Sequence, residues 1–86
     1  MLPHLEPHHV VMLRERLRLL RRERGMTLKQ LQDLSGIPLQ TISHIERGFT
    51  ENPGVHTVIA LAKALDVTVD YLTGQTQDRS RGENVS

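Results

Sequence analysis

The feature that most constrains the fold is the short distance between two runs of apolar residues on either side of Gly36. In each run the apolar residues recur at helical spacing, which is typical of an amphipathic helix. Gly36 can adopt the left-handed conformation that ends a helix, and Pro38 allows a new helix to begin within one or two residues. Two helices joined so tightly must cross steeply. The sequence therefore predicts crossed helices on either side of Gly36, the second over about residues 39–47.

Three further helices follow from the apolar pattern, and no segment shows the alternation of a strand. The first begins near Val10 and is ended by Gly25, because glycine is common just past a helix end. The other two are expected over about residues 55–65 and 69–73, the last with Thr68 as its N-cap. We expect these apolar positions to be buried: Val10, Leu13, Leu17, Leu20, Leu28, Leu31, Leu34, Ile42, Ile45, Val58, Leu61, Ala62 and Leu65.

The helix that precedes Gly36 also carries a start signal. Thr27 and Gln30 form a Thr-x-x-Gln capping box, in which each side chain bonds the other residue's backbone N–H. The sequence therefore predicts an all-α chain of five helices. Its 86 residues suffice for one domain and not for two. We expect residues 1–9 to be a flexible N-terminal arm, 10–74 to be the folded domain, and 75–86 to be a disordered tail.

Composition narrows the function classes. The chain has no cysteine, which excludes disulfides, thiolate zinc sites and cysteine nucleophiles. Its only aromatic residues of the Phe, Trp and Tyr types are Phe49 and Tyr71, so the core must be aliphatic and no aromatic platform for stacking single-stranded bases can be built. No apolar run reaches the roughly 20 residues that a membrane span needs, and the N-terminus does not resemble a signal peptide. We expect a cytoplasmic protein with no membrane partner.

Catalysis and metal binding find little support in the sequence. No paired carboxylates and no Ser/His/Asp set are suggested, so we expect no enzyme activity and no cofactor. His4, His8 and His9 cluster near the N-terminus, but at most two of them can share a helix and no acidic or cysteine ligand lies beside them. We therefore expect no metal site.

Charge is uneven along the chain although its net value is only +1. The segment from Arg14 to Arg24 contains six arginines and two glutamates, which gives it a local charge of +4. Such a run is either a solvated helix face or a nucleic-acid contact, and charge alone does not decide between them.

The stretch from about Leu13 to Leu72 resembles the phage-repressor and Cro-type helix-turn-helix family, also called the xenobiotic-response-element family. The motif consists of MTLKQL at 26–31, SGI at 35–37, TISHIERG at 41–48, NP at 52–53 and LAKALDV at 61–67. Gly36 lies six residues before Ile42 and nine before Ile45, the spacing that places the turn and both anchors of a recognition helix. The resemblance implies a lambda-repressor-like, five-helix domain that binds double-stranded DNA.

Site residues follow from the same resemblance. Leu39, Gln40, Ser43 and His44 occupy base-reading positions: Gln40 can bond an adenine edge bidentately, and Leu39 can touch a thymine methyl. Phosphate contacts are expected from Thr27, Lys29, Arg47, Thr50 and Asn52. A homodimer contact is expected from Phe49, Val69, Tyr71 and Leu72, although a lone Phe49 after a helix end is otherwise typical of a satellite core residue.

The sequence departs from the family pattern at four positions. Leu28 stands where a phosphate-contacting glutamine is common, so Thr27 or Lys29 would have to supply that contact. Gln32 replaces a usual small residue, and Asp66 replaces a common glycine. Pro38 replaces a side-chain cap and leaves N–H groups of the third helix unpaired or available to a phosphate.

The predicted function is sequence-specific regulation of transcription by a dimeric repressor or autoregulator. Doubling the site is the simplest remedy for a lone recognition helix, which contacts few bases. The alternative is a protein-interaction module of the same fold, such as an antitoxin whose partner is a toxin. Leu28 and Leu39 favour that alternative, because they are apolar residues on a surface that is expected to be exposed to solvent.

Overall fold

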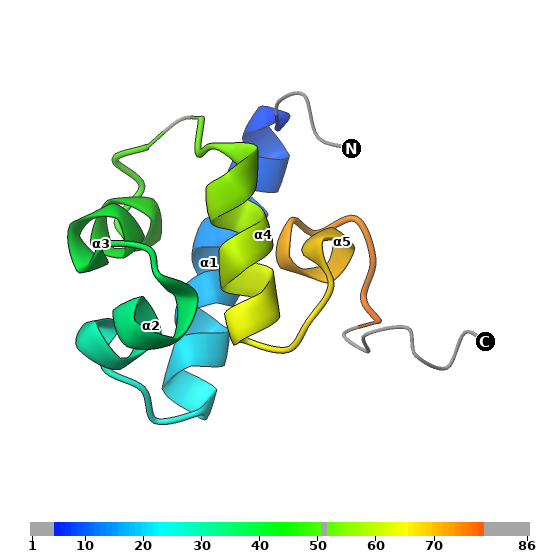
Figure 1. Cartoon of the computed structure of the whole chain (residues 1–86). Helices are drawn as coiled ribbons and strands as arrows, with labels where there is room; N and C mark the ends of the chain where they lie inside the picture. Colours follow the sequence, from blue (N-terminus) through cyan, green and yellow to red (C-terminus); the bar gives the residue numbers. More distant parts are fainter. Residues whose placement is uncertain (1–4, 51, 79–86) are drawn as a thin grey trace.

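The computed structural model describes residues 5–50 and 52–78, and this part of the chain contains five α-helices and no strand. The expected all-helical fold is therefore confirmed. The helices are α1 (Pro7–Glu23), α2 (Leu28–Ser35), α3 (Leu39–Glu46), α4 (Val55–Ala64) and α5 (Val69–Leu72). Figure 1 shows α1 and α4 at the centre of the molecule, with α2 and α3 on one side and α5 on the other.

The local signals at the helix ends act as expected. Thr27 Oγ1 accepts from the N–H of Gln30 at 3.0 Å while Gln30 Oε1 accepts from the N–H of Thr27 at 2.8 Å, which completes the capping box at the start of α2. Gly36 ends α2 with φ +79°, and Thr68 caps α5 by accepting from the N–H of Tyr71. Asp66 has φ +59°, the conformation that its alignment with a family glycine suggested.

The N-terminal helix begins earlier than the apolar pattern indicated. It starts at Pro7 rather than near Val10, because proline fits the first helical turn, where its missing N–H is not needed. Leu5, 7% exposed, lies in the core just before this helix. Residues 5–9 are thus part of the folded unit, and the remainder of the predicted arm, residues 1–4, lies outside the described residues.

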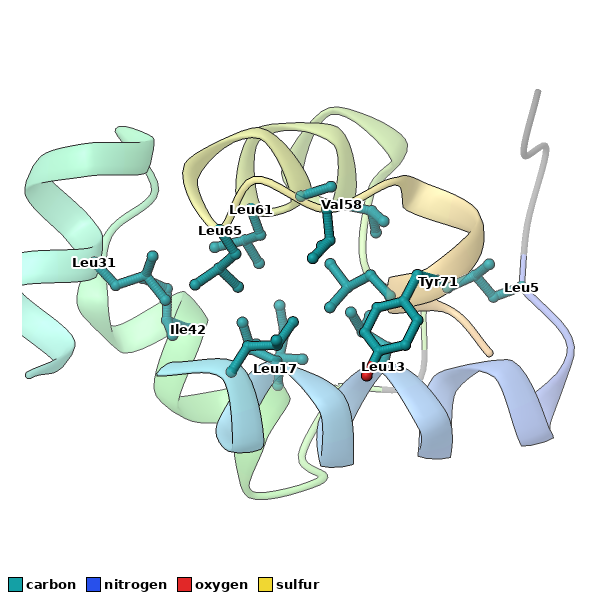
Figure 2. Close-up of a cluster of buried hydrophobic side chains, with 14 residues drawn as sticks. Leu5, Leu13, Leu17, Leu31, Ile42, Val58, Leu61, Leu65 and Tyr71 are labelled. Carbon is teal, nitrogen blue, oxygen red and sulfur yellow. The ribbon is translucent and has the colours of Figure 1, made fainter. Parts of the chain in front are cut away.

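The core is aliphatic, with Tyr71 as its one aromatic member. Figure 2 shows these side chains converging from α1, α3, α4 and α5, with Leu31 of α2 at one end and Tyr71 with Leu5 at the other. The expected burial holds for every position except Val10, Leu28 and Leu34, of which Val10 is half-buried. Leu28 is half-buried, and Leu34 is 59% exposed because it is turned about 60° around α2 from the buried Leu31.

Arg16 joins the start of the predicted C-terminal tail to α1. Its guanidinium donates to the carbonyl oxygen of Tyr71 at 2.6 Å, to that of Thr76 at 2.8 Å, and to Gln77 Oε1 at 3.0 Å. Only 8% of this residue is exposed, and its Cζ lies 4.2 Å from the centroid of the Tyr71 ring. Residues 75–78 therefore run along the domain, whereas residues 79–86 lie outside the described part of the chain.

Candidate nucleic-acid interface

The turn between α2 and α3 satisfies each of its backbone donors. The N–H of Gly36 bonds the carbonyl oxygen of Gln32 at 2.8 Å, and that of Ile37 bonds Ser35 Oγ at 3.1 Å. Pro38 has no N–H, and the N–H of Leu39 bonds Gln32 Oε1 at 2.8 Å. The first N–H of α3 is therefore paired within the protein, contrary to the expectation from Pro38, since a side chain of α2 replaces the missing cap.

The third helix has a buried side and an exposed side. Ile42 and Ile45 lie in the core, and they determine which side of α3 faces inward. Gln40 and His44 are exposed and, being four residues apart, share a face of the helix. Leu39 and Ser43 are half-buried. The structure thus brings the four predicted base-reading residues together on the outer side of α3, with Gln40 and His44 the most accessible.

A charged network holds the C-terminal end of α3 against α1. Glu46 is only 5% exposed, and its carboxylate accepts from Arg21 Nε at 2.7 Å and from Arg21 Nη2 at 2.9 Å. Arg18 Nη2 donates to the backbone carbonyl of Glu46 at 2.9 Å, and Arg21 Nη1 donates to the carbonyl of Met26 at 2.8 Å. The hydrogen bonds to Glu46 raise the pKa of Arg21 above the already high value of arginine. This network therefore fixes the C-terminal end of α3 against α1.

Sequence reasoning missed this network. It identified Glu46 only as part of the helix-ending motif and interpreted the arginines of α1 as a solvated face or a nucleic-acid contact. The available signal was the carboxylate at the last position of a helix that must pack on an arginine-rich one, because a buried charge requires a partner.

The predicted phosphate contacts fall into two groups. Thr27 and Lys29 lie at the start of α2, where Lys29 Nζ forms an exposed ion pair with Asp33 at 3.1 Å. Arg47, Thr50 and Asn52 follow α3; Arg47 and Asn52 are exposed, and Thr50 is half-buried. Arg47 Cζ lies 5.0 Å from the centroid of the Phe49 ring, and His44 meets the same ring edge-on at 5.9 Å between centroids.

The predicted dimer contact is divided between the surface and the core. Phe49 is 64% exposed, so it is not the satellite core residue that its position would otherwise suggest. Val69 is half-buried. Tyr71 and Leu72, however, pack inside the monomer, because the short α5 uses them to contact α1 and α4. A second chain cannot reach these two side chains without opening the domain.

Two further expectations concern metals and membranes. Within the described residues no three His, Cys, Asp or Glu side chains are grouped to hold a metal ion. His8 and His9 lie with their ring centroids 4.0 Å apart, and His4 is outside the described part. None of the helices described has the length and apolar character required to cross a membrane.

Comparison with known proteins gives consistent matches. A family model described as helix-turn-helix matches residues 17–72. The HTH-type transcriptional regulator DdrOP3 of Deinococcus deserti is 44% identical over 61 residues, 70% of this chain and 46% of that protein. An uncharacterized HTH-type transcriptional regulator of Sinorhizobium fredii, y4dJ, is 40% identical over 63 residues, 73% of this chain and 80% of that protein. The chain thus covers less than half of DdrOP3 and most of y4dJ.

Solved structures agree with these sequence matches. The N-terminal DNA-binding domain of SinR from Bacillus subtilis superposes with a TM-score of 0.68 at 31% identity, covering 71% of this chain and 88% of that one. A crystal structure of SinR, the master regulator for biofilm formation, in complex with DNA superposes with a TM-score of 0.66 at 30% identity. The match covers 70% of this chain and 95% of that one.

Proposed function

The chain belongs to the helix-turn-helix family of DNA-binding transcriptional regulators, and from this we propose that α3 inserts into a major groove and recognises a specific duplex sequence. The observation that carries the proposal is the geometry of α3. Ile42 and Ile45 anchor its inner side, Glu46 ties its end to α1, and Gln40 and His44 extend outward from the rigid face that remains. That a SinR chain similar to this one was solved in complex with DNA supports DNA binding by this chain.

Within this proposal the residues divide into reading and positioning groups. Gln40 pairs with an adenine edge, His44 and Ser43 read neighbouring base pairs, and Leu39 packs on a thymine methyl. The phosphate contacts come from Thr27, Lys29, Arg47, Thr50 and Asn52, and they set the register of α3 in the groove. Lys29 must exchange its ion pair with Asp33 for a phosphate, at little cost because that pair is exposed.

We further propose that two chains bind an inverted repeat and repress transcription. A single α3 contacts few bases, and each good bidentate pair is worth roughly 1–3 kcal/mol of discrimination, so two half-sites are needed for strong specificity. Of the four residues predicted for the dimer contact, Phe49 is the one with a largely exposed side chain, so the proposal places the contact at Phe49.

Selection of binding sites from random duplex tests the reading assignment. The parent should recover a motif with two related halves, whereas Gln40→Ala should lose preference at one position of each half and bind the parent's best site about 1–3 kcal/mol more weakly. Non-specific affinity should barely change, because glutamine releases no counterions. The control is Gln75→Ala, an exposed glutamine beyond α5. Recovery of the same motif with the same information by the parent and Gln40→Ala would show that α3 is not the reading helix.

A protein-interaction module is the second candidate, and the exposed side chains of Leu34 and Phe49 favour it. Leu28 and Leu39 give it less support than their sequence positions suggested, because both are half-buried and Leu28 packs against the core. If the parent selects no motif, while Leu34→Ser and Phe49→Ser reduce binding to a protein partner such as a toxin, this second function replaces the first.

A further inference from the structure

Gln32 is the residue that connects α2, the turn and α3. Its backbone carbonyl accepts the N–H of Gly36 at 2.8 Å, and its side-chain oxygen accepts the N–H of Leu39 at 2.8 Å. One residue thus holds both the glycine that ends α2 and the first residue of α3. The sequence pattern marked position 32 only as a departure from the small residue usual there.

The bond from Gln32 pairs one of the N–H groups that a helix leaves free at its start, that of the first residue of α3. Pro38 occupies the N-cap position of α3 and forms no side-chain cap hydrogen bond. A cap supplied by the preceding residue would satisfy α3 alone, whereas a cap supplied from α2 also constrains α3 relative to α2. Ile42 and Ile45 anchor α3 from its fourth residue onward, and the Gln32 bond adds a polar restraint from α2 at the first residue, next to Gln40.

We propose that Gln32 is a positioning residue for base recognition: its side chain sets the direction of the first turn of α3 and hence the base edge that Gln40 reaches. This inference rests on the proposed DNA-reading function of α3. Gln32 itself is half-buried and is assigned no contact with DNA. Its effect is exerted through Leu39, whose N–H it holds beside the Gln40 backbone.

Two substitutions separate this role from general stability. Gln32→Met keeps the length of the side chain and removes the acceptor. Gln32→Glu keeps an acceptor oxygen and adds a negative charge near the α3 N-terminus, where an anion is favourable. The matched control is Gln30→Met, because Gln30 Oε1 also accepts a backbone N–H at 2.8 Å, but that of Thr27 at the start of α2 rather than one in α3.

We expect Gln32→Met to flatten the preference at the Gln40 position of each half-site and to weaken binding to the parent's best site about two- to tenfold, the equivalent of one lost hydrogen bond. Its non-specific affinity should stay within about twofold, because no charge is changed. Gln32→Glu should keep the parent's preference and weaken binding to all duplexes alike. Gln30→Met should lower stability and keep the preference.

Amide hydrogen exchange of the free proteins gives a readout that does not depend on DNA. The Leu39 N–H should exchange faster in Gln32→Met than in the parent and should stay protected in Gln32→Glu and Gln30→Met. The inference is overturned if Gln32→Met keeps the parent's motif, or if Gln30→Met alters that motif as much. A parent that selects no motif overturns the proposed function and the inference together, which distinguishes that failure from the first two.

Discussion

Glu46 shows how one side chain can determine where a helix lies. Its carboxylate meets Arg21 through two hydrogen bonds of 2.7 and 2.9 Å in an almost fully buried position, while its carbonyl accepts from Arg18. Because the same residue ends α3 and contacts α1, α3 cannot shift along α1 without breaking a charge-assisted pair. The pair is consequently both a stabilising and an orienting feature.

Replacing Glu46 by Gln should lower the free energy of unfolding by about 1–3 kcal/mol, because the amide preserves size but loses the charge that Arg21 requires. Glu15→Gln, an exposed change on α1, is the control and should stay within about 0.5 kcal/mol of the parent. Urea unfolding followed by circular dichroism measures both. Because pairing with Glu46 raises the pKa of Arg21, the stability that Arg21 contributes is fully present below the pKa it has in the unfolded chain. This stability is lost only as the pH rises through the higher pKa of the folded state, so it is constant around neutral pH. Equal losses in the two variants would contradict the proposed role of the pair.

The same residues show what the sequence could and could not predict. The capping box of Thr27 and Gln30 and the left-handed Gly36 were predictable, because each depends on residues within a few positions of one another. The bonds from Glu46 to Arg21 and from Gln32 to Leu39 join separate helices. Their partners depend on the packing angle between those helices, which periodicity does not give.

At the scale of elements, α1 is an arginine-rich helix in which three arginines bond to other segments of the domain. Arg16 reaches the end of α5, while Arg18 and Arg21 reach the end of α3. The basic run is therefore neither a plain solvated face nor a nucleic-acid contact along its whole length. An alternation of arginine with leucine does not reveal which arginines turn inward, because long side chains can bury their stems and still reach backbone carbonyls.

Arg16→Met should separate α5 and the following residues from α1. The substitution keeps an apolar stem and removes the charged donor shared by the carbonyls of Tyr71 and Thr76, at an expected cost of about 1–3 kcal/mol of stability. The Tyr71 carbonyl keeps its backbone bond from the N–H of Gly74. Amide exchange should accelerate at residues 75–78 more than within α2 and α3. Arg22→Met, a change at an exposed site on the same helix, should do neither. Unchanged exchange at residues 75–78 would indicate that this segment is held without Arg16.

The whole molecule separates its proposed reading helix from its C-terminal helix. Figure 1 shows α3 and α5 on opposite sides of the α1 and α4 pair, and Figure 2 shows the core running between them from Ile42 to Tyr71. The sequence predicted five helices through the resemblance of residues 13–72 to a known fold, but it did not predict that α3 and α5 lie on opposite sides. It misassigned Tyr71 and Leu72 to a surface because apolar residues in a four-residue helix show too little periodicity to tell an inner from an outer face.

Association of two chains can be tested on the side chain that remains exposed. Phe49→Ser should shift sedimentation of the protein toward the monomer at high micromolar concentration and weaken binding to a two-half site more than to a single half-site. Its thermal unfolding as a monomer should hardly change, since Phe49 is largely outside the core. A Phe49→Ser protein that associates as strongly as the parent would place the contact elsewhere, and a parent that stays monomeric with and without DNA would remove the dimer altogether.

The single tyrosine gives the molecule an intrinsic optical probe. The chain has no tryptophan, so ultraviolet emission comes chiefly from Tyr71, whose ring lies in the core under the Arg16 guanidinium. In Figure 2 this ring is at the opposite end of the core from Ile42. The intensity of this emission should therefore change when the end of the core between α1 and α5 unfolds. It should hardly change when a duplex binds at α3. Comparing it with a signal from α3 would show whether the two ends of this small domain melt together or in turn.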